Sequence, residues 1–278
     1  MLLGVEIKEF QKTVWGYYAV NKRAMPWREK ITPYYVFVSE VMLQQTQVAR
    51  VMEKFPQFIK LFPNFKALAE APLNELLSAW QGMGYNRRAL YLKKAAEVVM
   101  RDYRGRLPQS PEELEKLAGI GPATARSIAV FAWNSPEFFI ETNVRAVFLH
   151  HFFAGRSGVK DGDILPLVKK ALPLPSLRQG SGGQAREWYY ALMDYGTMLK
   201  KVNKNPSRAS AHYVKQSKFE GSVRETRGKI VRLLTNSSFT ETALAKRASE
   251  PIDKIKTALG GLMRDGLIKK DGYTFRII

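Results

Sequence analysis

A stretch of amide side chains beside one carboxylate is the first feature of this sequence that could do chemistry. Residues 39–48 read Ser-Glu-Val-Met-Leu-Gln-Gln-Thr-Gln-Val. Helical spacing would place Glu40, Gln44 and Gln47 on one face, next to a face of apolar residues. Amides can read base edges or occupy the space of a displaced base, whereas the structural alternative is a solvated polar stripe. The stretch is therefore a candidate nucleic-acid contact.

A glycine-bearing turn is the second such feature. Residues 117–125 read Leu-Ala-Gly-Ile-Gly-Pro-Ala-Thr-Ala, which joins one helical segment to the next. Glycines allow positive φ and close backbone approach, and the N-terminus of the following helix offers backbone N–H donors. Such a turn can grip a phosphate without a charged side chain. Gly-x-Gly also serves as plain packing in helical hairpins, so both interpretations stay open here.

Charge and cysteine content narrow the function classes. The 278 residues include 44 Lys and Arg against 25 Asp and Glu, a net charge of +19. This excess favours a polyanionic partner. The sequence has no cysteine, which excludes disulfides, a cysteine nucleophile and cysteine-ligated metal or iron–sulfur sites. Short apolar runs and the lack of a signal-peptide pattern predict a cytoplasmic, nucleoid-associated protein without membrane contact.

Helices must position both features. From about residue 6 to residue 153 the apolar residues recur at helical spacing, and no run alternates as a strand would. Another helix is expected over about 186–200. Residues 177–184 are of low complexity and predict a surface insertion. Residues 200–229 carry nine basic and two acidic residues, which predicts an extended arm lying on a polyanion.

The last fifty residues have a different pattern. We expect helices over 227–234, over 238–248 from a capping box that starts at Ser238, and from Pro251 to about residue 265. Asp271-Gly272 then predicts a hairpin turn. Three helices followed by a hairpin are the element order of a winged helix. The basic segment that precedes this winged helix favours DNA contact, and a protein-docking module is the alternative.

Several short strings together resemble one protein family. The chain is similar over about residues 5–200 to the helix-hairpin-helix (endonuclease III-like) DNA glycosylases, and most of all to their adenine DNA glycosylase (MutY-type) branch. The resemblance implies a mainly α fold of two helical subdomains with a base-flipping pocket between them. It is carried by Pro26-Trp27-Arg28, Pro33-Tyr34, residues 39–48, Gln81-Gly82-Met83-Gly84-Tyr85 and residues 119–125.

The resemblance implies catalytic roles for two carboxylates and an amide. Glu40 matches the family acid that protonates the adenine ring so that the base can leave. Glu141 falls where the family usually has an aspartate, which stabilises the cationic sugar as the glycosidic bond breaks. Glutamate is one methylene longer, so its reach differs. Asn143 matches an asparagine near that carboxylate.

The resemblance also implies DNA contacts. Arg23, Arg28 and Leu43 would line the base pocket. Gln45 and Tyr85 would enter the duplex, one near the vacated space and one beside the opposing base. Ala123 lies where relatives with strand-cleaving activity carry a Schiff-base lysine, so base release without strand cleavage is expected. The phosphate-binding turn would consist of Gly119, Gly121, Ala123 and Thr124.

Two departures from the family pattern affect cofactor and specificity. Most relatives carry four cysteines after the position of Met198, where this chain has Leu199-Lys200-Lys201-Val202 and no cysteine follows. We therefore expect no iron–sulfur cluster, no metal and no other cofactor. The family's usual β-rich C-terminal domain, which recognises 8-oxoguanine, is replaced by the winged-helix-like segment.

The sequence thus predicts a mainly α DNA N-glycosylase. Its expected parts are a glycosylase domain (1–200), a basic arm (201–224) and a winged-helix-like domain (225–278). The expected activity is hydrolysis of the N-glycosidic bond of a flipped adenine opposite guanine or 8-oxoguanine, in double-stranded DNA, by a monomer. The alternatives are a mismatch thymine or uracil glycosylase and a non-catalytic DNA-binding protein on the same fold.

Overall fold

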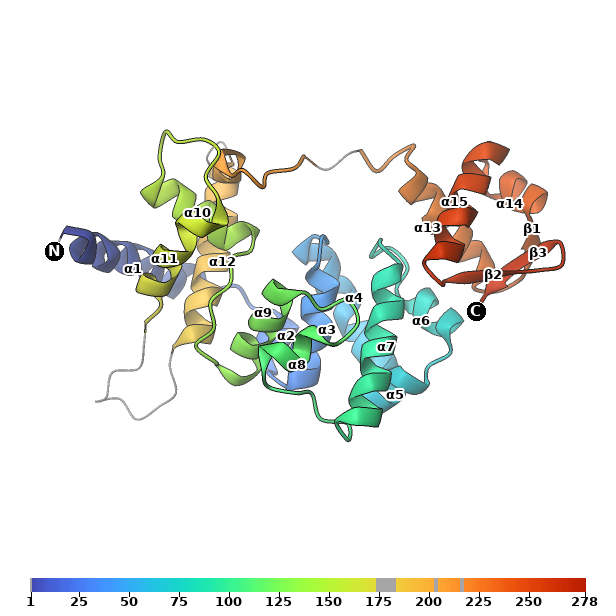
Figure 1. Ribbon diagram of the computed structural model, residues 1–278, viewed down its shortest axis with the longest axis horizontal. Helices are drawn as coiled ribbons and strands as arrows, with labels where there is room; N and C mark the ends of the chain where they lie inside the picture. Colours follow the sequence, from blue (N-terminus) through green and yellow to red (C-terminus); the bar gives the residue numbers. More distant parts are fainter. Residues whose placement is uncertain (1, 174–183, 203–204, 216–217) are drawn as a thin grey trace. The chain divides into compact units, whose positions relative to one another are not determined.

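The computed structural model describes residues 2–173, 184–202, 205–215 and 218–278 (Figure 1). Over these residues the regular secondary structure is helical, apart from a small C-terminal sheet and one isolated bridge. This confirms the predicted mainly α fold. All but the last residue of the expected insertion at 177–184 lies outside the described residues. The chain divides into two compact units: unit 1 comprises Met1–Val36, Gln109–Glu112 and Gly121–Lys215, and unit 2 comprises Phe37–Pro108, Glu113–Ile120 and Gln216–Ile278.

Unit 1 is a helical assembly around α12. Aromatic side chains fill its centre: the ring of Phe10 lies 5.1 Å from that of Phe148 and 5.8 Å from that of Trp188, which is fully buried. Such edge-on and tilted pairs bury large apolar areas. Its helices are α1 (Leu2–Asn21), α2 (Pro26–Glu29), α9 (Pro122–Trp133), α10 (Thr142–Phe152), α11 (Asp161–Ala171), α12 (Ala185–Val202) and the 3-10 helix η1 (Pro206–Ala209).

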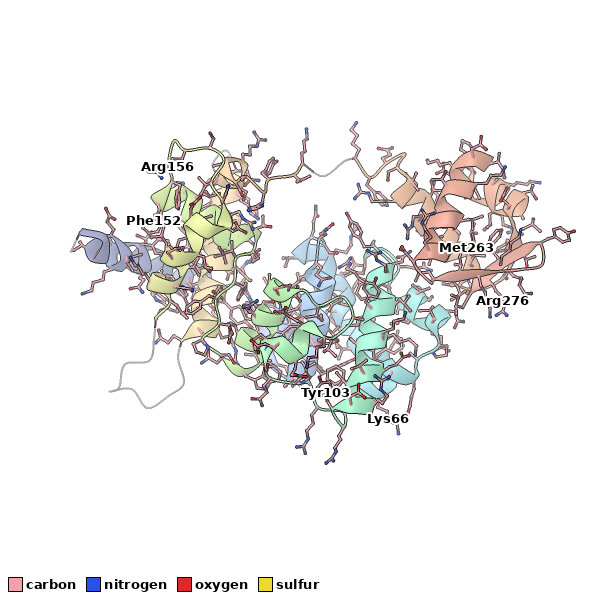
Figure 2. The ribbon with its side chains drawn as sticks, viewed as in Figure 1. Lys66, Tyr103, Phe152, Arg156, Met263 and Arg276 are labelled. Carbon is pink, nitrogen blue, oxygen red and sulfur yellow. The ribbon has the colours of Figure 1, made fainter. Side chains whose placement is uncertain are left out.

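Unit 2 begins with a second helical assembly. Its core includes Phe37, Phe58 and Trp80, all almost completely buried. Tyr103, just after α7, donates a 2.7 Å hydrogen bond to Glu113 (Figure 2). The helices are most of α3 (Pro33–Leu43), α4 (Val48–Leu61), α5 (Phe65–Glu70), α6 (Leu73–Ala79), α7 (Arg87–Asp102) and part of α8 (Pro111–Glu115).

The C-terminal part of unit 2 has the predicted winged-helix order. The sheet is antiparallel with strand order β1-β3-β2, so the first strand pairs with the last. Arg276 of the last strand forms a 3.0 Å ion pair with Asp271 (Figure 2). The elements are α13 (Val223–Leu234), β1 (Phe239–Thr240), α14 (Glu241–Ala248), α15 (Ile252–Arg264), β2 (Ile268–Asp271) and β3 (Thr274–Ile277).

Local details of this part differ from the sequence predictions. Helix α13 begins four residues earlier than predicted, because Ser222 caps it. The predicted cap at Ser238 is wrong: Thr240 caps α14, since Phe239 and Thr240 form β1. The hairpin turn is shifted by one residue, because Asp271 pairs with Thr274 across the ladder.

Within the described ranges, no helix combines the length and the apolar character that crossing a bilayer requires.

Candidate active site

One buried arginine connects two turns of unit 2. Arg88 lies on α7 and is only 8% exposed. Burial lowers the pKa of its guanidinium to about 10, so it remains charged at neutral pH. It donates hydrogen bonds to the carbonyls of Val41 and Met42 at 2.9 Å, to Oγ1 of Thr46 at 2.8 Å, and to the carbonyls of Met83 and Gly84 at 2.9 and 3.1 Å.

These hydrogen bonds coincide with the end of α3. The last carbonyls of a helix lack intrahelical partners, and the Arg88 guanidinium supplies donors to two of them. The chain then turns, and the amide of Thr46 donates to the carbonyl of Leu43 at 3.2 Å. The predicted continuous helical face carrying Glu40, Gln44 and Gln47 is therefore wrong after Leu43.

The two turns present residues in the same uncommon backbone conformation. Gln45 has φ 54° and Tyr85 has φ 46°, in the left-handed region. For a residue other than glycine this conformation costs about 1–2 kcal/mol. Both residues are exposed, Tyr85 to 40%. Sequence reasoning assigned both to the duplex, and the structure places them on two turns that share Arg88 as a hydrogen-bond donor.

Glu40 lies one turn before the end of α3. It is partly buried, whereas its neighbours Ser39 and Val41 are 1% and 3% exposed. Leu43, the last residue of the helix, is partly buried as well. A carboxyl group is one of the side chains that can act as a general acid.

The glycine turn approaches the same region of unit 2. Gly119 has φ +79°, and a Cβ built there would lie 2.9 Å from Cδ2 of Tyr91. Glycine is therefore required by both conformation and space. The carbonyl of Gly119 accepts a hydrogen bond from Nε2 of Gln44 at 3.2 Å. The structure thus brings together residues of the two strings that sequence analysis singled out separately.

Beyond this turn, Gly121 is the N-cap of α9 in unit 1. Pro122 occupies the first turn, where a proline loses no helical hydrogen bond. Gly121 and Ala123 are exposed, and Thr124 is partly so. The first turn has no acidic residue, and the N-terminal end of a helix favours anions. This helix end can bind a phosphate through its backbone.

Glu141 caps the N-terminus of α10 in unit 1. Its Oε1 accepts hydrogen bonds from the backbone amides of Asn143 and Val144 at 2.8 and 2.9 Å. Its Oε2 accepts from Nδ2 of Asn143 at 3.2 Å. The carboxylate is held at the positive end of the helix dipole. A group oriented in this way can stabilise a developing cation without reorganising.

Close packing against α12 fixes Asn143 as well. A Cβ added to Gly196 would lie 2.5 Å from the Asn143 carbonyl oxygen, so the helices touch backbone to backbone. Lys200 lies four residues after Gly196, on the same side of α12. Burial lowers the Lys200 pKa, the nearby Glu141 carboxylate raises it and Arg23 lowers it further. Lys200 therefore belongs to the surroundings of Glu141.

The two arginines predicted for the base pocket share a buried carboxylate. Asp194 is 2% exposed. It accepts from the backbone N and Nε of Arg23 at 3.0 and 2.7 Å, and from Nη1 of Arg28 at 3.0 Å. The Arg28 guanidinium also stacks on the Tyr190 ring at 4.2 Å. These arginines have structural partners in unit 1, and their contact with a base stays a prediction.

Sequence reasoning missed Arg88 and Asp194. Asp194 had a usable signal, because it is a lone acid within the largely apolar stretch Tyr189–Tyr195 of a helix. Arg88 had none, since it is one of many cations in a basic chain and only its tertiary surroundings distinguish it.

An iron–sulfur cluster of the usual kind requires cysteine thiolates as ligands. The chain has no cysteine. Across the described parts of the chain, no group of three or more His, Cys, Asp or Glu side chains could hold a metal ion. The residues present therefore do not fit the cluster that the family usually carries.

Curated relatives bear a consistent name. The adenine DNA glycosylase of Buchnera aphidicola subsp. Baizongia pistaciae is 36% identical over 143 residues, which are 51% of this chain and 41% of that protein. The chain thus matches less than half of that relative's length. The adenine DNA glycosylase of Mycolicibacterium smegmatis is 29% identical over 276 residues, 92% of this chain and 91% of that protein.

A solved structure and a family match agree on the fold. A thermostable thymine-DNA glycosylase superposes with a TM-score of 0.62 at 23% identity, covering 72% of this chain and 90% of that one. Residues 38–169, which include Glu40, the glycine turn and Glu141, match the HhH-GPD superfamily of base excision DNA repair proteins. Residues 38–169, a little under half of the chain, form an HhH-GPD domain.

Proposed function

We propose that this protein is a monofunctional adenine DNA glycosylase of base excision repair. The observation that carries the proposal is the set of relatives named adenine DNA glycosylase, one of them aligned over 92% of the chain. Both carboxylates that such a reaction needs are present in partly buried positions. The substrate would be double-stranded DNA with adenine opposite guanine or 8-oxoguanine.

In this reaction Glu40 would supply the proton. A protonated adenine is a better leaving group, because the electrons of the glycosidic bond pass to the cationic ring and the base departs as neutral adenine. Glu141 would stabilise the positive charge that develops on the sugar. Its hydrogen bonds to the start of α10 hold it in one orientation, and Asn143 supports it from the same helix turn. Arg23, Arg28 and Leu43 are proposed to line the base pocket.

Two exposed turns and one helix N-terminus are proposed to contact DNA. Gln45 and Tyr85 would enter the duplex, and their exposure on turns supports this role. The backbone from Gly119 to Thr124 would bind a phosphate. Position 123 is an alanine, which cannot form a Schiff base, so no strand cleavage is proposed.

The proposed reaction requires no cofactor. A different segment packs where the family resemblance implies an iron–sulfur cluster in most relatives. Residues 205–211 are held within unit 1 by backbone hydrogen bonds: Val159 donates to Ala209 at 3.0 Å, and Ala211 donates to Val159 at 2.8 Å. The Ser207 hydroxyl also donates to the Thr142 carbonyl at 3.4 Å, beside Glu141. We propose a monomer that acts in the cytoplasm at the nucleoid.

Single-turnover base release from a panel of duplexes tests the function. The panel contains adenine opposite guanine, 8-oxoguanine or cytosine, and thymine or uracil opposite guanine. We expect release of adenine. Release of thymine or uracil alone would establish the mismatch alternative, and binding without release of any base would establish a non-catalytic protein.

Glu40→Gln tests the acid. The amide keeps the shape of the side chain but cannot deliver a proton, so release should slow by about 10²-fold or more while DNA affinity is retained. Glu75→Gln, a change at an exposed residue of α6, is the matched control. Release near the parent rate in Glu40→Gln would remove Glu40 from this role.

A further inference from the structure

A guanidinium from the C-terminal domain meets the Tyr85 turn. Arg224 lies at the start of α13. Its Nη1 donates a 2.8 Å hydrogen bond to the Tyr85 hydroxyl, and its Nη2 donates a 3.4 Å hydrogen bond to the Lys218 carbonyl. Its guanidinium carbon is 5.8 Å from the centre of the Tyr85 ring, and that of Arg88 is 5.7 Å from the same centre. Tyr85 is therefore contacted by a buried arginine of α7 and by a more accessible one from the winged-helix-like domain.

Packing within unit 2 fixes this arrangement. Asp265, which follows α15, forms an ion pair with Arg87 of α7 at 3.3 Å and another with Arg227 of α13. Helix α13 also packs on α6. Arg224 lies one helical turn before Arg227, so the contacts that hold the domain also place Arg224 beside Tyr85.

The surroundings of this turn are basic. Arg50 donates to the Gly82 carbonyl at 2.8 Å, and Arg87 follows Tyr85 by two residues. Lys54 also approaches Gly82. Basic side chains around an exposed aromatic ring are the combination that stacks on bases and neutralises phosphates.

We propose that Arg224 is a specificity-determining residue that contacts the base opposite the excised adenine and favours guanine there. The inference rests on the proposed function, in which Gln45 and Tyr85 enter the duplex, and it assigns Tyr85 to the position beside the opposing base. A stacked tyrosine has its hydroxyl at the edge of the base stack, so a guanidinium bonded to it lies at the edge of the neighbouring base. The planar fork of arginine matches the adjacent acceptors O6 and N7 of guanine, which cytosine lacks.

The experiment compares adenine release opposite guanine with release opposite cytosine, under single-turnover conditions, in the full chain. Arg224→Lys keeps the charge but loses the fork, and we expect the guanine-to-cytosine rate ratio to fall at least about fivefold. Arg224→Ala should lower the ratio by at least as much. Arg232→Ala, an exposed arginine of the same helix, is the matched control and should leave the ratio unchanged.

A second measurement, of binding affinity, does not require base release. Affinity is measured for duplexes with a tetrahydrofuran abasic analogue opposite guanine or cytosine, and Arg224→Lys should reduce the preference for guanine. Tyr85→Phe, which removes the hydroxyl that orients Arg224 and keeps the ring, should reduce it as well.

The outcomes separate the inference from the proposed function. If the parent protein releases no adenine opposite any base, the proposed function fails, and this inference fails with it. If adenine is released but both Arg224 variants keep the parent ratios, only the inference is overturned. A uniform loss opposite guanine and cytosine, with a shallower salt dependence of binding, would also overturn it, because that result indicates a phosphate contact.

Discussion

The two units bury charge by opposite means. In unit 1 a buried carboxylate, Asp194, is neutralised by the guanidinium groups of Arg23 and Arg28. In unit 2 a buried guanidinium, Arg88, is surrounded by carbonyl groups and one hydroxyl. The first arrangement joins side chains from distant parts of the chain. The second organises backbone, and thereby sets the conformation of the turns that present Gln45 and Tyr85.

The two arrangements differ in how tightly they fix the chain. An ion pair can lock helices together while its members stay long and adjustable. A guanidinium that donates to backbone carbonyls on two turns fixes the relative position of those turns, because several hydrogen bonds must be satisfied at once. In unit 2, the guanidinium bound to backbone carbonyls lies at the exposed turns that we propose enter DNA.

The largest stability effect is expected where the ion pair of unit 1 is broken. Asp194→Asn removes the charge that neutralises two arginines, one of them with a side chain only 5% exposed. We expect the free energy of unfolding to fall by about 3–5 kcal/mol, as for other buried pairs that lose one partner. Denaturant unfolding measures this, with Glu9→Gln, an exposed acid of α1, as the control. A loss equal to that of the control would show that the buried pair contributes nothing.

Arg88→Met should remove the hydrogen bonds that connect the two turns of unit 2. The methionine fills similar space but leaves carbonyls of both turns without their donor, so we expect a loss of about 2–3 kcal/mol in unfolding free energy. Binding to duplex DNA should weaken as well, because Gln45 and Tyr85 would no longer be held together. Lys94→Met, at an exposed position of the same helix, is the control. Parent-like DNA binding in Arg88→Met would contradict the positioning role.

In unit 1, Glu141 also binds backbone groups, because its carboxylate accepts hydrogen bonds from the amides at the start of α10. Glu141→Gln keeps an N-cap acceptor and should cost only about 0.5–1 kcal/mol in stability, yet release of adenine should slow by about tenfold or more. Glu141→Asp shortens the side chain by one methylene and restores the family's usual residue. Thermal unfolding and single-turnover release, measured together, separate the cap from the chemistry. Equal losses of stability and activity would mean that Glu141 is a cap only.

The smallest effect concerns pH. His151 is half-buried, accepts or donates a 3.0 Å hydrogen bond with Tyr195, and has a pKa lowered to about 4 by burial and by His150. Because the unfolded chain binds this proton near the ordinary value of 6.5, stability is full above about pH 6.5 and declines as the pH falls toward 4. Solvent screening of a half-buried group limits the effect to about 1 kcal/mol.

His151→Phe should flatten the stability profile between pH 6.5 and 4. Unfolding measured across this range gives the slope, and His150→Gln, an exposed neighbour, should retain most of it. An unchanged slope in His151→Phe would assign the acid sensitivity to other groups.

Several features were predictable because their signals are local. Periodic apolar residues predicted the helices, and the order of elements after residue 222 predicted the winged helix, which the strand order confirms. The absence of cysteine removed the usual cluster from consideration. Errors arose where two local signals competed: Ser238 and Thr240 can both cap a helix, and only pairing of β1 with β3 decides between them.

Residue types and their spacing predicted the fold class and the glycine turn, and the resemblance to a known family predicted the candidate catalytic groups. Only the tertiary structure decided that α3 stops at Leu43, that Arg23 and Arg28 share Asp194, and that Arg224 reaches Tyr85. The physical reason is that a charged side chain takes its partner from whatever the fold brings within hydrogen-bond distance. In a chain with 44 basic residues, spacing alone does not show which arginines will be buried.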